Sequence, residues 1–212
     1  MKINTAVIAT GNPYKLHEIG EILNGFSIKI MSMNDVGLAD LDIIEDGNSF
    51  EENALIKART VMKQTGYMAI ADDSGLEVDF LDNEPGIYSA RFAGENASDE
   101  ENNEKLLRLL EDVAPDRRQA RFVSVIAVVM PDGEYFTVKG YLYGTIAHRP
   151  IGQNGFGYDP LFIPVGYDGL TLGQIDGKEK NKISHRAKAL EKMQIIFRER
   201  LGDGKIKDSS TR

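Results

Sequence analysis

The sequence contains no cysteine among its 212 residues. It therefore has no disulfide, no thiolate nucleophile and no zinc site built on thiolates, and any metal must bind carboxylates, histidines or water. No apolar run approaches the roughly 20 residues of a membrane span, and the amino terminus lacks the basic and then apolar pattern of a signal peptide. These absences predict a soluble, cytoplasmic protein with no membrane partner.

Basic residues are scarce relative to acidic ones, with 25 Lys and Arg against 33 Asp and Glu and a formal net charge of −8. Non-specific binding to DNA or RNA depends on Lys and Arg neutralising phosphates, so this balance argues against a nucleic-acid partner. A small anionic ligand is compatible with it if basic side chains gather locally. The length suits one domain, 1–212, with a polar tail from about residue 202.

Apolar periodicity predicts helices interleaved with strands. The predicted strands and short apolar runs are 3–10, 26–31, 67–71, 76–81, 121–130, 135–146 and 161–163. Helices are predicted after residue 13, over 49–64, after residue 98 and over 182–201. Ser49 with Glu52 and Ser98 with Glu101 have the spacing of capping boxes. A turn at 131–133 predicts an antiparallel hairpin, and the whole pattern indicates an α/β fold around a mixed sheet.

The segment 71–76, Ala-Asp-Asp-Ser-Gly-Leu, places two adjacent carboxylates and a hydroxyl between two apolar runs. We interpret it as a sharp turn, because Asp, Ser and Gly are ordinary turn residues. Two such side chains can hold a hard divalent ion, or one can hold the ion while the other takes a proton from water. Glu45, in an irregular acidic stretch, is a candidate second ligand. Since adjacent residues on a turn can both reach one ion, the roles of Asp72 and Asp73 stay open.

Two segments carry positive charge or free donors suited to phosphate. In 10–15, Thr-Gly-Asn-Pro-Tyr-Lys, a strand meets a helix. The free N–H groups at that helix start and the charge of Lys15 attract an anion. On the helix over 49–64, Asn53 and Lys57 are four residues apart and share a face, so Lys57 can point into the same site. Taken singly, each also fits a plain turn or a solvated charge.

Two later segments suit a flat, carbonyl-bearing ring. In 155–160, Gly-Phe-Gly-Tyr-Asp-Pro, glycines admit a flat ligand, an aromatic ring can stack on it and an Asp can accept from ring N–H groups. His185 and Arg186 offer donors to carbonyl oxygens, and Lys180 lies just before them. Alone, the first segment also fits a hydrophobic turn, and a lone His is usually structural.

In this order, the segments resemble the inosine triphosphate pyrophosphatase family, also called the Ham1-like or RdgB-like non-canonical purine nucleoside triphosphate pyrophosphatases. The likeness extends from residue 10 to about residue 190. The motifs that carry it are Thr-Gly-Asn at 10–12 with Lys15 and Glu18, Ser-Phe-Glu-Glu-Asn-Ala at 49–54 with Lys57 and Ala58, the acidic segment 71–76, Pro-Gly-Ile-Tyr-Ser-Ala-Arg at 85–91, the segment 155–160 and Ser-His-Arg at 184–186.

The resemblance implies a magnesium-dependent enzyme that hydrolyses ITP, dITP and XTP to the monophosphate and pyrophosphate. It implies a long-stranded mixed sheet flanked by helices, two lobes with the active-site cleft between them, and a homodimer. Asp73 would accept a proton and, with Glu45, bind the metal. Asp72 would support Asp73, and Lys57 would assist at the phosphates. The implied substrate-binding residues are Thr10, Gly11, Asn12, Pro13, Tyr14, Lys15, Ser74, Phe156, Gly157, Tyr158, Asp159, Lys180, His185 and Arg186.

Two alternatives stay open. A Maf-like nucleotide pyrophosphatase would have a different base specificity, although 156–159 and 184–186 favour a purine. A non-catalytic nucleotide-binding module belongs to another class of protein. The presence of Glu45, Asp72 and Asp73 argues against that module, because a binder needs phosphate donors and does not need a set of acids.

Overall fold

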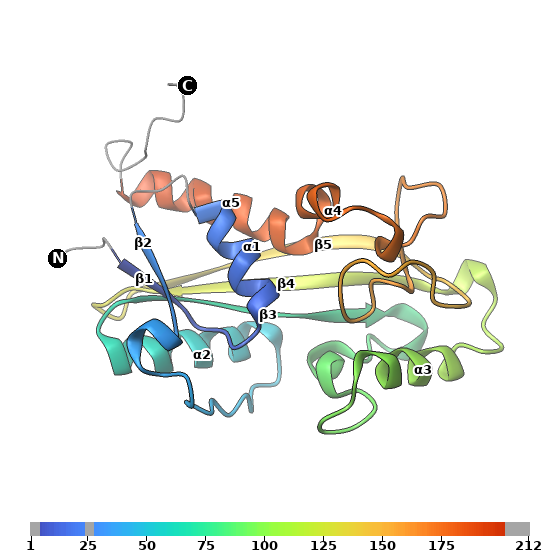
Figure 1. Ribbon diagram of the computed structural model, residues 1–212, viewed down its shortest axis with the longest axis horizontal. Coiled ribbons are helices and arrows are strands. Elements are labelled where there is room, and N and C mark those ends of the chain that lie inside the picture. Colours follow the sequence, from blue (N-terminus) through green and yellow to red (C-terminus); the bar gives the residue numbers. More distant parts are fainter. Residues whose placement is uncertain (1–4, 24–27, 202–212) are drawn as a thin grey trace. The chain divides into compact units, whose positions relative to one another are not determined.

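The computed structural model describes residues 5–23 and 28–201. Within them lies a sheet of six strands in the order β2-β1-β3-β4-β5-β6 (Figure 1). The strands are β1 (Thr5–Ile8), β2 (Lys29–Ser32), β3 (Met68–Val78), β4 (Gln119–Val129), β5 (Tyr135–Ile146) and β6 (Phe162–Pro164). Strand β1 is parallel to β2 and β3, whereas β5 and β6 are antiparallel. The sheet is therefore mixed, and the predicted α/β class is confirmed.

Helices connect and cover these strands. They are α1 (Pro13–Leu23), α2 (Phe50–Thr65), α3 (Asp99–Leu109), α4 (Gly177–Ile183) and α5 (His185–Leu201). Single 3-10 turns are η1 (Asn34–Val36), η2 (Asp79–Leu81), η3 (Gly86–Arg91), η4 (Pro115–Arg117) and η5 (Leu172–Gln174). In the part of the chain that the structure describes, no helix is both long and apolar enough to cross a membrane.

The chain groups into two compact units. Among the described residues, the first unit draws on those up to 73, on 125–140 and on 187–201, and the second on 74–124 and 141–186. The polar tail predicted from about residue 202 lies outside the described residues. Strands β3, β4 and β5 each supply residues to both units. The boundary in β3 falls between two residues of the acidic segment, Asp73 and Ser74. The active-site cleft between two lobes stays a prediction.

In the first unit, helices cover both faces of the sheet (Figure 1). Helices α1 and α5 pack on the face that carries Phe136 and Val138 of β5, within one apolar core. Helix α2 lies on the other face, where its Glu51 accepts a hydrogen bond from Thr137 and pairs with Lys139, both at 2.7 Å. Because residues alternate between faces along a strand, the two sets of contacts place these helices on opposite sides.

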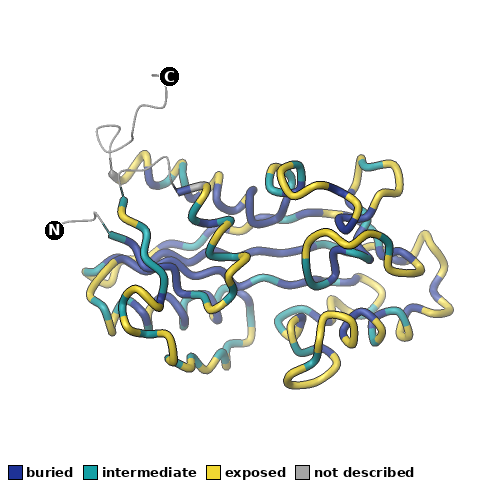
Figure 2. The backbone as a smooth tube through the Cα atoms, in the orientation of Figure 1, coloured by how far each residue is buried: buried dark blue, intermediate teal, exposed yellow. Residues whose placement is uncertain are grey.

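In the second unit, Leu106 of helix α3 and Leu110, which directly follows the helix, pack against apolar residues of β3, β4 and β5. The predicted capping box at its start is confirmed, since Ser98 and Glu101 bond to each other's backbone N–H groups. Figure 2 shows the strands largely buried and much of the connecting chain exposed. Local signals thus fixed the start of α3, and apolar burial fixed its inner face.

The prediction of a sharp turn at 71–76 is wrong. Strand β3 runs unbroken from Met68 to Val78 and includes the whole acidic segment. It lies between β1 and β4 in the sheet, and its pairing with β1 covers Met68 to Ile70, so the acidic segment continues as extended backbone a strand that the sheet already holds, despite the preference of Asp, Ser and Gly for turns. Both carboxylates are buried in this strand, at 1% exposure for Asp72 and 8% for Asp73.

Two helix predictions also need correction. The helix predicted over 182–201 is divided, because Ser184 is extended (φ −61°, ψ 155°) between α4 and α5. At the start of α2, Ser49 accepts from the Glu52 N–H as predicted, but Glu52 Oε2 accepts from the Asn48 N–H, so the capping box is incomplete. The predicted end is confirmed, since Gly66 adopts the left-handed conformation there.

Candidate active site

The two adjacent carboxylates of β3 serve different lysines. Asp72 Oδ2 lies 2.8 Å from Lys15 Nζ of helix α1, and Asp73 Oδ1 lies 2.9 Å from Lys57 Nζ of helix α2. Successive side chains of a strand point to opposite faces, and α1 and α2 cover opposite faces of the sheet. The interpretation that both acids can reach one ion depended on the turn, and it is wrong for a strand. Asp73 and Asp72 therefore have separate surroundings.

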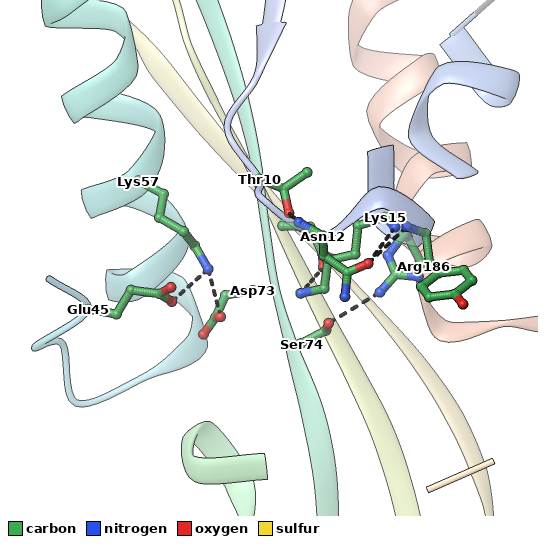
Figure 3. A network of polar contacts seen from close by, with 10 residues as sticks. Thr10, Asn12, Lys15, Glu45, Lys57, Asp73, Ser74 and Arg186 are labelled. Atoms are coloured by element: carbon green, nitrogen blue, oxygen red, sulfur yellow. Dashed lines mark hydrogen bonds and ion pairs between the residues drawn. The ribbon is translucent and has the colours of Figure 1, made fainter. Parts of the chain in front are cut away.

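Asp73 belongs to a group of three charged side chains (Figure 3). Lys57 Nζ lies between Asp73 Oδ1, at 2.9 Å, and Glu45 Oε2, at 2.6 Å. Among the residues that the structure describes, no group donates a hydrogen bond to the buried Asp73 Oδ2. One oxygen of Asp73 is thus fixed by Lys57, and the lone pairs of the other, buried oxygen have no donor among the described residues.

The electrostatics of this group favour a charged lysine and a more basic aspartate. Burial raises the pKa of the Asp73 carboxyl above its ordinary value of 3.8, and the positive charges of Lys57 and Lys15 only partly counteract that effect. Burial lowers the pKa of the Lys57 ammonium, but the charges of Asp73 and Glu45 outweigh it and raise that pKa overall. Asp73 is consequently a stronger base than an exposed carboxylate and is held by a cation that does not titrate near neutral pH.

Glu45 and Asp73 also fit the needs of a magnesium ion. Within the described residues, no three carboxylates or histidines gather into a metal-binding group. Magnesium typically binds one or two protein carboxylates and completes its shell with water and substrate phosphates. The buried Asp73 Oδ2, with no donor of its own, is an oxygen of the kind that such an ion binds. The two acids therefore suit an ion that arrives with its substrate.

The loop that carries Glu45 is held by Asn53, a residue that was not predicted from the sequence to belong to the site. Asn53, only 1% exposed, accepts a hydrogen bond from the Gly47 N–H at 2.9 Å. A Cβ on Gly47 would lie 2.7 Å from Asn53 Oδ1, so a residue without a side chain is needed there. The shared face of Asn53 and Lys57 was a signal, but it does not reveal that Asn53 binds the backbone two residues after Glu45.

Asn12 organises the segment 10–15, which was predicted to bind phosphate (Figure 3). Its side-chain Oδ1 accepts from the N–H groups of Tyr14, at 2.9 Å, and Lys15, at 3.3 Å. Its own N–H donates to Thr10 Oγ1 at 3.1 Å. Asn12 therefore caps α1 and satisfies two N–H groups that the sequence had suggested for phosphate. The charge of Lys15, held by Asp72, is the remaining attraction for an anion in this loop.

In the second unit, Asp159 organises the segment 155–160, which was predicted to bind the purine base and is called the base loop below. Asp159 Oδ2 accepts from the Phe156 N–H at 2.9 Å and pairs with Lys180 Nζ. That ammonium also lies 4.6 Å from the centre of the Phe156 ring. A Cβ on Gly155 would lie 1.9 Å from the same carboxylate oxygen. Asp159, Lys180 and Phe156 therefore come together as predicted, but Oδ2 of Asp159 fixes the loop.

Tyr158 is buried inside the second unit and connects the segment 155–160 to Ser89. It is 5% exposed, and its hydroxyl donates to the Ser89 carbonyl at 2.9 Å. Burial and the nearby charge of Asp99 raise the pKa of Tyr158, so its hydroxyl stays neutral. Ser89 Oγ in turn accepts a hydrogen bond at 2.8 Å from the N–H of Leu76, the last residue of the acidic segment of β3. The motif at 85–91 thus connects β3 to the base loop.

His185 and Arg186 begin helix α5 and are both buried. The His185 ring stacks on Phe122, with ring centres 4.9 Å apart and planes inclined by 14°. Arg186 Nη2 donates to Ser74 Oγ at 3.3 Å (Figure 3). The ring of His185 is thereby held in a fixed plane, and Arg186 meets the one hydroxyl of the acidic segment. Two predicted substrate-binding residues, Ser74 and Arg186, are in contact.

The site chemistry and the mixed α/β sheet define a class of protein. A buried basic carboxylate, a second acid and nearby lysines are typical of enzymes that hydrolyse phosphate anhydrides, in which charge must be stabilised and water deprotonated. Comparisons with known proteins identify the family within that class. Residues 6–196 match the model of the Ham1 family. The chain belongs to the Ham1 family.

The chain is similar to curated and solved members along most of its length. It is 50% identical over 195 residues to a dITP/XTP pyrophosphatase of Thermoanaerobacter sp. (strain X514), covering 92% of this chain and 97% of the relative. It is 47% identical over 192 residues to a dITP/XTP pyrophosphatase of Bacillus subtilis (strain 168), covering 91% and 96%. The structure of the Staphylococcus aureus Ham1 protein matches with a TM-score of 0.84 at 42% identity, covering 92% of this chain and 98% of that one.

Proposed function

We propose that this chain hydrolyses the non-canonical purine nucleoside triphosphates ITP, dITP and XTP to the nucleoside monophosphate and pyrophosphate. The observation that carries the proposal is Asp73, a buried carboxylate with a raised pKa, one oxygen fixed by Lys57 and the other without a donor among the described residues. The curated relatives named dITP/XTP pyrophosphatase support the same substrates. A nucleotide-binding module without catalysis has no need of this base.

In the proposed reaction, a water oxygen attacks the α-phosphorus, and the bond from that phosphorus to the bridging oxygen breaks to release pyrophosphate. Asp73 orients the water and accepts its proton. Lys57 keeps Asp73 in place through the 2.9 Å contact and balances its charge. Lys15, paired with Asp72, supplies positive charge for the triphosphate. The protein thus contributes a base, its orientation and compensation for the anionic substrate.

Glu45 and Asp73 are the residues that would hold Mg²⁺ in this proposal. When bound, the ion withdraws charge from phosphate oxygens and lowers the pKa of water. The two acids already face one ammonium, Lys57, which limits their mutual repulsion in the absence of an ion. Calorimetric titration of magnesium into the complex with a non-hydrolysable ITP analogue, for the wild type and for the Glu45→Gln variant, tests this assignment, and equal affinity in both would exclude Glu45.

The base is selected by the second unit in this proposal. Hypoxanthine and xanthine carry a 6-oxo acceptor, whereas adenine carries a 6-amino donor. Donors of His185 and Arg186 can pair with the 6-oxo acceptor. With adenine in the site, the same buried donors would face another donor and lack a partner, and such a mismatch can lower kcat/KM for ATP by orders of magnitude. The Phe156 ring, next to Lys180, is the group proposed to stack on the purine.

Pyrophosphate release from ITP, XTP, dITP, GTP, ATP, UTP and dTTP in the presence of magnesium tests the proposal. We expect turnover of ITP, dITP and XTP to exceed that of ATP and the pyrimidines by at least about a hundredfold in kcat/KM. Activity confined to pyrimidines would favour the Maf-like alternative, and no turnover of any triphosphate would favour the binding module. A homodimer and a cytoplasmic location stay predictions, and light scattering on the purified protein checks the dimer.

A further inference from the structure

One glycine of the base loop has both of its backbone polar groups held by helix α3. The Gly157 N–H donates to Asp99 Oδ2 at 2.6 Å, and the Gly157 carbonyl accepts from Asn103 Nδ2 at 3.0 Å. Asp99 and Asn103 are four residues apart, so they lie on the same face of the helix. Gly157 itself has φ +62°, a left-handed conformation that favours glycine. The loop is therefore fixed at the residue between its two aromatics.

The helix that holds Gly157 is itself firmly attached to the second unit. Asn102, adjacent to Asn103, accepts from the Ala93 N–H at 2.8 Å and donates to the Ala90 carbonyl at 3.2 Å. Both asparagines are buried, at 3% and 8% exposure. Asn102 uses both ends of its amide, whereas Asn103 uses its Nδ2 and its buried Oδ1 has no partner among the described residues. Polar side chains are rarely buried without such bonds, so the donor of Asn103 has a specific structural task. The two asparagines connect α3 to the 85–91 motif on one side and to the base loop on the other.

We infer that Asp99 and Asn103 are positioning residues for purine recognition, since they fix Gly157 and thereby place Phe156 and Asp159. The inference rests on the proposed function for its substrate, but the geometry is independent of it. Phe156 precedes Gly157, and its N–H bonds to the same Asp159 oxygen that faces Lys180. A rotation of the Gly157 peptide groups therefore moves the stacking ring and the ion pair together.

The consequence is a separation between binding and chemistry. Asp99 and Asn103 bond to the loop that is proposed to bind the purine, in the second unit, whereas Asp73 and Lys57 lie in the first unit. Releasing Gly157 should weaken binding of the purine and its discrimination from adenine, while the step at phosphorus continues in the molecules that do bind. General unfolding has a different result, because it lowers the active fraction and leaves KM and the ITP/ATP preference unchanged.

The test compares Asn103→Asp with Asn102→Asp. Each variant adds one charge at a buried position of α3 and removes one donor to a backbone carbonyl, but only Asn103 bonds to Gly157. We expect Asn103→Asp to raise KM for ITP and lower the ITP/ATP ratio of kcat/KM by about tenfold each, with kcat changed by less than about threefold. Asn102→Asp should lower the melting temperature similarly and leave KM and the ratio within about twofold.

A second pair of variants covers the case in which a buried charge prevents folding. Asp99 is exposed, so Asp99→Ala should fold and should show the same change in KM, whereas Asp99→Asn retains an acceptor and should restore most of the wild-type value. Glu100→Ala removes a charge from the same first turn and is the control. An unchanged KM and ITP/ATP ratio in both Asp99→Ala and Asn103→Asp would overturn the inference.

Hydrogen exchange distinguishes this inference from the proposed function. The Gly157 amide should exchange at least about tenfold faster in Asp99→Ala than in the wild type or Glu100→Ala, whatever the substrate is. If the wild type does not hydrolyse ITP, the proposed function fails, and the exchange rate still decides whether α3 holds the loop. Unchanged exchange at Gly157 would show that these bonds do not fix it.

Discussion

The two parts of the candidate site are held by different forces. Around Asp73, a few charges determine the geometry, since one ammonium, Lys57, holds two carboxylates. Around Gly157, hydrogen bonds between side chains and backbone groups determine it, since Asp99 and Asn103 hold Gly157 and Asp159 accepts from the Phe156 N–H. Charges suit a reaction in which charge develops, and a fixed backbone suits recognition of a flat base. Substitutions in the two parts should therefore alter different kinetic constants.

The largest effect is expected from Asp73→Asn. The variant keeps the size of the side chain but cannot accept the proton of water, so we expect kcat to fall by about a thousandfold or more. Burial disfavours the ionised carboxylate, so a neutral amide should leave the melting temperature within a few degrees of the wild type. Pyrophosphate release and calorimetry measure both quantities. The control is Asp79→Asn, an exposed residue just after β3, and unimpaired hydrolysis in Asp73→Asn would remove Asp73 from the mechanism.

The comparison is sharpened by removing one buried lysine from each part. Lys57→Met should lower kcat about a hundredfold, because the base loses its orientation and its compensating charge. Lys180→Met should chiefly raise KM for ITP, by about tenfold, since it removes the ammonium that faces Asp159 and the Phe156 ring. Each loses a buried ion pair, at a cost of about 3 kcal/mol of stability.

Steady-state kinetics on the folded fraction of both variants provides the check. The two variants are matched in chemistry and burial, at 8% and 7% exposure of the lysines. If both substitutions lowered kcat to the same extent with KM unchanged, the division between a charged catalytic part and a recognition part would be wrong.

These contrasts also show what the sequence could and could not predict. The motifs selected Asp73, Glu45 and Lys57 as candidates, and the structure brings these three side chains into contact. Local capping signals correctly placed the start of α3 and the end of α2. The sharp turn at 71–76 was wrong because propensity describes an isolated segment, whereas here the segment continues a strand that is part of the sheet. Because of that error, the sequence did not predict that Asp72 and Asp73 point to opposite faces of the sheet.

Long-range backbone contacts were the other class of information that sequence could not supply. Asn53 and Asn103 each bond to a backbone group in a loop, at Gly47 and Gly157, and such a bond leaves no periodic pattern. The break between helices α4 and α5 at Ser184 was not predicted, for a related reason. The apolar residues on its two sides belong to separate cores, Ile183 to the second unit and Leu190 to the first, although their spacing fits one helix.

A smaller effect is expected from Gly47→Ala. The added Cβ would lie 2.7 Å from Asn53 Oδ1 and 2.7 Å from Glu52 Cβ, so the loop that carries Glu45 must shift. We expect a loss of about tenfold in kcat, because a displacement far from the reacting atoms still disturbs alignment. Gly20→Ala is the control, since its Cβ meets nothing within 4 Å in helix α1 and should stabilise the protein by about 0.5 kcal/mol. Equal activity in the two variants would show that the position of Glu45 is not critical.

The smallest effect is a change in the pH dependence of stability, measured by urea unfolding without divalent metal. The pKa of Asp73 is raised in the folded protein, so between 3.8 and that raised pKa the folded state binds more protons than the unfolded state. Stability should therefore fall as the pH rises through this window, and Asp73→Asn should remove that fall. The raised pKa of Lys57 affects stability in the same direction at alkaline pH: stability is lost as the pH rises through that pKa, and Lys57→Met removes the loss.

If the stability of the wild type instead rose relative to Asp73→Asn across the acidic window, the charges of Lys57 and Lys15 would outweigh burial at Asp73. Asp73 would then be a weaker base than proposed, and the deprotonation of water would depend more on the metal.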